Sequence, residues 1–81
     1  MRIFDTMIPE LGEQVWEEGL RVTAQDVDRA AEAALRAREE RGDLEAHPSA
    51  CQVTVQLRTA APPGPRVVRV VQVKGETWLA C

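Results

Sequence analysis

Aromatic residues are scarce in this 81-residue chain, and lysine is almost absent. The aromatic side chains are Phe4, Trp16 and Trp78, and there is no tyrosine. The core must therefore be built from Val, Leu, Ala and Ile. A chain of this length forms one domain and buries only about two-thirds of its unfolded surface, so the core is thin. A homodimer interface would add apolar burial that the monomer lacks.

Long hydrophobic runs are missing as well. No stretch approaches the ~20 apolar residues that cross a membrane. Asp5, Glu10 and Glu13 stand where a signal peptide would need an apolar run. We therefore expect a cytoplasmic protein without membrane contact. The excess of Arg over Lys, together with abundant Ala, is typical of a GC-rich bacterial or phage genome.

The N-terminal half predicts two helices. Phe4, Ile8, Leu11 and Val15 recur at three- and four-residue steps, which favours a helix over about residues 5–18 that ends at Gly19. A second helix is expected over residues 24–41, which are rich in Ala, Glu and Arg. Its start signals are an N-cap at Thr23, with Asp26 three residues on, and a hydrophobic staple between Val22 and Val27.

From Cys51 the hydrophobic period changes to two, which predicts strands. The expected strands span residues 51–58, 66–74 and 77–80, with the Pro-rich residues 60–65 as a hairpin loop. Apolar residues on both faces of the second strand suggest a central strand or a bulge. The predicted fold class is α+β, with two N-terminal helices packed on a three-stranded antiparallel sheet in the order α-α-β-β-β.

Ligands and nucleophiles for catalysis are few. His47 and Cys51 form a lone pair, whereas zinc sites use three or four protein ligands. A simple meander separates Cys51 from Cys81 by on the order of 15 Å, too far for a disulfide, so we expect two free thiols. The carboxylate pairs lie on predicted helix surfaces and face water, whereas general acid–base catalysis needs two that converge in a cleft, and Glu32 is expected to pair with Arg36.

The five glycines are isolated, so no phosphate-binding loop is expected. The sequence predicts neither an enzyme nor a cofactor. An enzyme would need chemistry from a partner subunit, and a third reading, an accessory subunit of a larger enzyme, predicts one stoichiometric partner encoded nearby.

Charge is divided unevenly along the chain. Residues 1–50 carry six Arg against twelve Asp or Glu, whereas residues 51–81 carry four basic residues against Glu76. The simplest interpretation is that an acidic helical layer and a basic sheet attract each other or are both solvated. The functional interpretation is a non-catalytic protein-binding or regulatory module, such as a small phage or bacterial inhibitor. Its acidic recognition face would comprise Asp26, Asp28, Glu32, Glu39 and Glu40.

The alternative is a nucleic-acid-binding regulator, either winged-helix-like or using its sheet. The residues for that function are Arg29, Arg58, Arg66, Arg69 and Lys74. Acidic residues in the first turns of the second predicted helix would repel phosphate, and an RNA-binding sheet normally has more aromatics than Trp78. Trp78 is interpreted first as a core residue at the edge of the sheet.

Overall fold

The computed structural model describes residues 1–42, 50–58, 65–74 and 77–80. Within those residues the chain forms five β-strands, two 3₁₀ turns and one α-helix. The elements in chain order are β1 (Arg2–Met7), η1 (Pro9–Leu11), η2 (Trp16–Glu18), β2 (Leu20–Ala24), α1 (Val27–Glu40), β3 (Ala50–Leu57), β4 (Val67–Lys74) and β5 (Thr77–Ala80).

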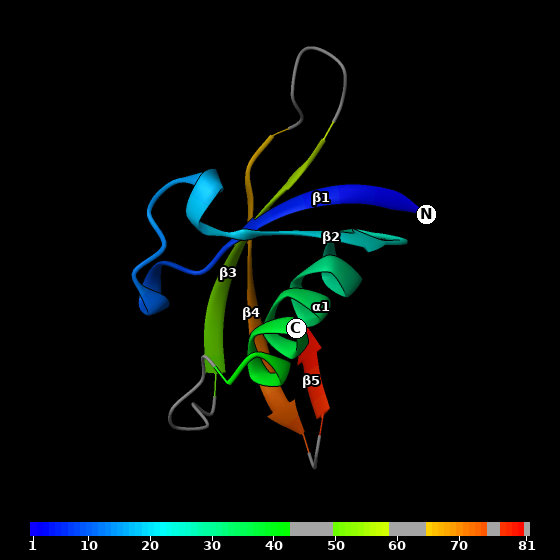
Figure 1. Cartoon of the computed structure of the whole chain (residues 1–81). Coiled ribbons are helices and arrows are strands. Elements are labelled where there is room, and N and C mark those ends of the chain that lie inside the picture. The colour runs from blue at the N-terminus through cyan, green and yellow to red at the C-terminus, as the bar shows by residue number, and fades with distance from the viewer. Residues whose placement is uncertain (43–49, 59–64, 75–76, 81) are drawn as a thin grey trace.

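The strands form a single antiparallel sheet in the order β2-β1-β3-β4-β5. The sheet is strongly curled, and in Figure 1 the ribbons of β1 and β2 cross the direction of β3 and β4. Helix α1 contacts every strand from one face, so the molecule is a half-barrel with a helix across it. The two edge strands, β2 and β5, both pack against this helix.

The predicted fold class of two helices on a three-stranded sheet is wrong, because residues 2–7 form strand β1. Within β1 the burial alternates, with Phe4 and Thr6 buried while Ile3 is 48% exposed. Of the expected helical stripe, Leu11 and Val15 are 37% and 50% exposed. The three- and four-residue spacing of these residues was therefore a coincidence, and the molecule is mostly sheet.

The second expected helix is confirmed apart from its first turn. Its N-cap is Asp26, whose carboxylate accepts a hydrogen bond of 2.8 Å from the Arg29 amide, so the prediction of Thr23 is wrong. Thr23 and Val22 belong instead to strand β2, where the predicted staple cannot form. Residues 20–24 alternate between apolar and polar side chains, which is a strand pattern.

The three C-terminal strands are confirmed within a residue of their predicted ends. On β3, Cys51, Val53 and Val55 are buried towards α1. Strand β4 lies between β3 and β5, as expected of a strand with two apolar faces. Nevertheless, Val68 and Val70 on its outer face are 53% and 38% exposed, because no described element covers that part of the sheet.

The core lies between α1 and the concave face of the sheet. Small side chains on α1 let the helix approach the strands closely. The core comprises Phe4, Ile8, Ala24, Ala30, Ala31, Ala34, Leu35, Cys51, Val53, Val55, Val71 and Trp78. Trp78 is 3% exposed on edge strand β5, which confirms its interpretation as a core residue.

Gly19 has a different role from the predicted helix cap. Its φ is −88°, which is not a left-handed conformation. A Cβ atom at this position would overlap the carbonyl oxygen of Thr6. The absence of a side chain therefore lets the chain enter β2 in close contact with β1, where the Thr6 hydroxyl donates a 2.8 Å hydrogen bond to the Leu20 carbonyl.

Candidate functional site

Three of the predicted acidic recognition residues connect α1 to the sheet, namely Asp28, Glu32 and Glu39. The carboxylate of Asp28 accepts a hydrogen bond of 2.8 Å from Arg69 on β4. Glu39 accepts a hydrogen bond of 3.2 Å from the indole nitrogen of Trp78. The Asp28–Arg69 pair joins an acidic residue of the helix to a basic residue of the sheet, as the charge pattern indicated, whereas the Trp78 indole is uncharged.

Glu32 is the most deeply buried of the predicted acidic residues, at 3% exposure. One carboxylate oxygen accepts a 2.6 Å hydrogen bond from Arg29, and the other accepts a 2.8 Å bond from the backbone amide of Ala80. The expected pair between Glu32 and Arg36 is wrong, since the carboxylate is directed towards β5 and Arg36 is exposed. Glu32 is therefore a structural contact between the helix and an edge strand.

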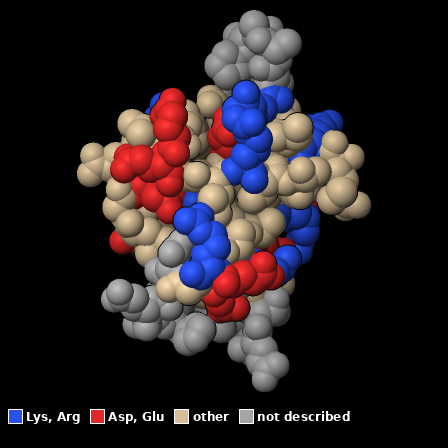
Figure 2. Space-filling model, in the orientation of Figure 1, with Lys and Arg blue, Asp and Glu red and all other residues tan. Residues whose placement is uncertain are grey.

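Asp26 and Glu40 complete the predicted acidic set, and both are exposed. Asp26 serves as the N-cap of α1. Figure 2 shows acidic side chains gathered over the η1–η2 segment and over the C-terminal part of α1, with basic side chains between the two groups. Negative charge is thus distributed over two regions of this surface, and one of them lies outside the helix that the sequence indicated.

The alternative basic set is also dispersed. Arg29 pairs with Glu32 and Arg69 pairs with Asp28, both on the helix side of the sheet. Arg58 lies 3.5 Å from Asp5, and the guanidinium of Arg66 lies 5.3 Å from the ring centroid of Trp16. The side chain of Lys74 lies outside the described residues.

The winged-helix outline is wrong, because the segment predicted as its first helix is strand β1 followed by two 3₁₀ turns. A wing would have used residues 60–65, of which 60–64 lie outside the described residues.

A buried cluster at the C-terminal part of α1 holds Arg38, whose side chain is 0% exposed. Arg38 donates two hydrogen bonds to Glu13, at 2.9 and 2.5 Å, and one of 2.7 Å to the Ala34 carbonyl. Burial opposes the charge on Glu13, but hydrogen bonds from Arg38 and the Ile8 amide outweigh it and lower the pKa of Glu13. The ion pair fastens the segment between β1 and β2 to the helix.

Cys51 is a free, buried thiol beside this cluster. Burial and the nearby carboxylate of Glu10 raise the pKa of Cys51 to about 12. The thiol is therefore protonated at neutral pH and is a poor nucleophile. The possible partner His47 and the second cysteine, Cys81, lie outside the described residues. No group of three or more metal-ligating side chains was found in the described part of the chain.

The two edges of the sheet differ in a way that no side-chain motif in the sequence indicates. In an antiparallel sheet, alternate residues direct their N–H and C=O groups to opposite neighbours. The Ile3 carbonyl accepts the Arg58 amide at 3.0 Å, so Ile3 faces β3 and Phe4 faces β2. The same alternation can be followed through the registers of β3, β4 and β5. It places the backbone N–H and C=O of Ala80 on the side of β5 that faces away from β4. The hydrogen bond from the Ala80 amide to Glu32 agrees with this assignment.

The same alternation defines the free edge of β2. Phe4 pairs with Val22, so Val22 faces β1 and the residues on either side of it face outward. The outward groups are the N–H and C=O of Arg21 and Thr23. Within the described part of the chain, no hydrogen bond to these four groups is seen. Glu32 thus caps an outward amide of β5, whereas the edge of β2 is open.

A groove of about 350 Å³ lies at the C-terminal end of β2, beside Thr23. One wall is the end of β2 with the residues that follow it, and the other wall is α1. The groove is lined by Met1, Thr23, Ala24, Gln25, Arg29, Glu32, Ala33 and Arg36. Backbone hydrogen-bonding groups and exposed arginines therefore lie beside the same depression.

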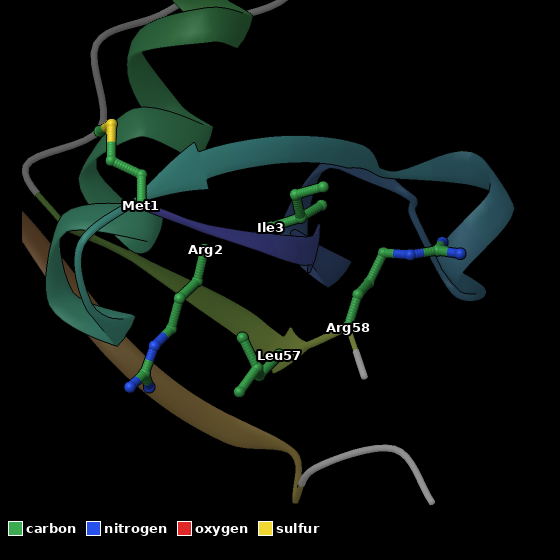
Figure 3. Close-up of a pocket in the computed structure, with 5 residues that line it drawn as sticks. All are labelled: Met1, Arg2, Ile3, Leu57 and Arg58. Atoms are coloured by element: carbon green, nitrogen blue, oxygen red, sulfur yellow. The ribbon is translucent and has the colours of Figure 1, made fainter. Parts of the chain in front are cut away.

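A second hollow, of about 550 Å³, lies at the other side of β1. Its floor contains Ile3 and Leu57, and it is bordered by Arg2 and Arg58 (Figure 3). The two guanidinium groups point away from one another in Figure 3. They do not converge on one position where an anion would sit, so the β2 groove is the better candidate site.

Comparisons with family models, with curated proteins and with solved structures found no match for this chain. The candidate site therefore depends on the geometry of the two sheet edges. The described residues contain no helix that is long and apolar enough to cross a bilayer.

The sequence prediction missed the β2 groove because residues 20–24 were interpreted as a helix end, a loop and a helix cap. The available signal was the alternation of Leu20, Val22 and Ala24 with two polar residues. That pattern predicts a strand, but it does not show which neighbour the strand pairs with. Only the order of strands in the sheet identifies β2 as an edge.

Proposed function

We propose that this protein is a non-catalytic protein-binding module, and that it binds its partner at the open edge of β2. The observation that carries this proposal is the contrast between the two edge strands. Natural sheets usually protect their edges, because unpaired backbone groups are a template for pairing with another chain. Here Glu32 binds one outward group of β5, the Ala80 amide, whereas in the described part of the chain no hydrogen bond is seen to the outward groups of Arg21 and Thr23 on β2.

The composition of β2 supports the same function. Proline, charged side chains (lysine above all) and bulges are common devices against edge pairing, and the segment Leu20–Ala24 contains neither proline nor lysine and has one charged residue, Arg21. Five residues in strand conformation extend for about 17 Å, which suits a short extended segment of a partner. Strand addition of this kind gains affinity from main-chain hydrogen bonds and specificity from neighbouring side chains.

The acidic recognition face remains a prediction, and fewer of its residues are now available to contact a partner. Asp28, Glu32 and Glu39 each have a partner inside the molecule, so their charges also stabilise the fold. Exposed Glu40 is the member that a charge reversal can address with least effect on the helix–sheet contact. A partner that binds through this face would lose affinity in Glu40→Lys and keep it in variants of β2.

The experiment compares the tagged wild-type chain with two variants of Thr23 in pull-downs from host lysate, with and without nuclease. Thr23→Pro removes an outward amide that β1 does not use, so the fold is retained, as for proline on other edge strands. Thr23→Val is the matched control, because it keeps the amide in a β-branched residue. Circular dichroism and thermal unfolding establish that both variants fold.

We expect a stoichiometric protein that survives nuclease, is retained by Thr23→Val and is lost by Thr23→Pro. If the partner is a second copy of the chain, analytical ultracentrifugation will show a dimer that Thr23→Pro dissociates. Equal capture by Thr23→Pro would contradict the assignment to the β2 edge. Recovery of nucleic acid, with proteins lost after nuclease treatment, would contradict a protein-binding function and favour the basic residues of the sheet.

A further inference from the structure

We propose that the occupant of the β2 groove is an extended segment of another protein that carries acidic side chains. This inference rests on the proposed function and adds the chemistry of the partner. The segment would pair with the outward groups of Arg21 and Thr23 as a sixth strand. Its side chains on the concave side of the sheet would then meet the wall formed by α1.

The charges that line the groove favour an acidic partner. Glu32 is the acidic residue among the lining side chains, and its two oxygens are already bonded to Arg29 and the Ala80 amide. Arg36 is exposed, and the described structure shows no ion pair to it. The groove therefore has a positive charge without an internal counterion, and the side chain of Arg29 is still 53% exposed.

A second positive charge lies on the strand itself, outside the residues that line the groove. Arg21 on β2 is 59% exposed and lies 3.5 Å from Asp5, a distance at which an exposed pair contributes little. An extended segment paired with β2 places side chains directly opposite those of Arg21, at the spacing of cross-strand pairs. A carboxylate at that position and another towards Arg36 would be matched by arginines on both sides of the added strand.

A second copy of this chain fits the groove less well. Pairing β2 with its own copy would bring together two segments that each contain Arg21 and no acidic residue. Both grooves would also retain the unbalanced charge of Arg36. Like charges across an interface disfavour association, so the groove selects a different, acidic segment.

The test selects peptides from a random twelve-residue display library on the immobilised full-length chain. We expect the enriched peptides to carry an excess of Asp and Glu between β-branched or aromatic residues. Binding of a selected peptide to the wild-type chain should weaken as salt is added, and Arg36→Gln should weaken it about 10-fold and reduce that salt dependence, as expected for a partly exposed charge pair. Arg66→Gln is the matched control, since that exposed arginine lies at the start of β4, with β1 and β3 between it and β2.

The same peptides separate the two proposals. Binding that is lost in Thr23→Pro but is not biased towards acidic peptides, and is unchanged in Arg36→Gln, would overturn the acidic partner and leave strand addition in place. Acidic peptides that bind Thr23→Pro as tightly as wild type would overturn both, since they would bind by charge alone. Absence of any enrichment would contradict the protein-binding function at this edge.

Discussion

At the scale of single residues, a buried ion pair between Arg38 and Glu13 joins helix α1 to the segment between β1 and β2. Arg38 has no solvent contact, and its guanidinium depends on Glu13 and a helix carbonyl for its hydrogen bonds. Removing one partner of a buried ion pair is costly because the other charge remains desolvated. The sequence could not identify this pair, because its two members are 25 residues apart.

Substitution of Glu13 tests this ion pair. Glu13→Gln should lower the free energy of unfolding at pH 7 by about 3 kcal/mol, because Arg38 loses its counterion. The pKa of Glu13 is lowered in the folded protein, so its contribution is complete above the ordinary value of 4.5 and is lost as pH falls through the lowered pKa. Urea unfolding of both proteins at pH 7 and pH 3 measures this difference.

The exposed Glu17→Gln is the matched control and should change stability by less than about 0.5 kcal/mol. A deficit in Glu13→Gln that is the same at both pH values would contradict an origin in the Glu13 carboxylate. Equal stability of wild type and Glu13→Gln at pH 7 would contradict the ion pair itself.

At the scale of elements, the C-terminal strands could be predicted from the sequence and the N-terminal strands could not. Residues 51–57 alternate over a long enough stretch for a period of two to be clear. In residues 2–7 the strand has only six residues, and Ile8 and Pro9 directly after it continue a pattern that also fits a helix start. The pairing of β1 with β3 joins segments about fifty residues apart, which local periodicity cannot reveal.

The contact between α1 and β5 gives the prediction at this scale. Glu32→Ala removes the carboxylate that accepts the Ala80 amide and leaves Arg29 without its partner. We expect the free energy of unfolding to fall by about 2 kcal/mol and the Ala80 amide to exchange faster with solvent. Amide hydrogen exchange followed by NMR measures the second effect residue by residue.

Glu40→Ala is the control for Glu32→Ala, because Glu40 is an exposed acidic residue on the same helix. It should leave the Ala80 exchange rate unchanged. An unchanged rate in Glu32→Ala as well would show that Glu32 does not protect the β5 edge, and the contrast between the two sheet edges would lose its basis.

At the scale of the whole molecule, one ion pair agrees with the attraction that the charge pattern indicated between an acidic helix and a basic sheet. That pair joins Asp28 on α1 to Arg69 on β4. Asp28, Glu32 and Glu39 of the predicted recognition residues lie on contacts between the helix and the sheet, because a sequence shows the sign of a charge but not its neighbour. The candidate site at β2 depends on strand order, which the sequence does not contain in any short motif.

The curled sheet explains why one helix is sufficient for this fold. Helix α1 contacts all five strands, so its small side chains fill the concave side without a second helix. In the described part of the chain, no element covers Val68 and Val70 on the outer face, and no hydrogen bond is seen to the outward backbone groups of β2.

The central claim is that Arg21 and Thr23 offer unpaired backbone groups to a partner strand, and amide hydrogen exchange of the labelled chain tests it most directly. In the free protein, we predict fast exchange at Arg21 and Thr23 and slower exchange at Val22, which faces β1. Adding a selected acidic peptide should slow exchange at Arg21 and Thr23 while Val22 changes little. Slow exchange of Arg21 and Thr23 in the free protein, or protection that appears elsewhere while these two amides stay fast, would contradict the account.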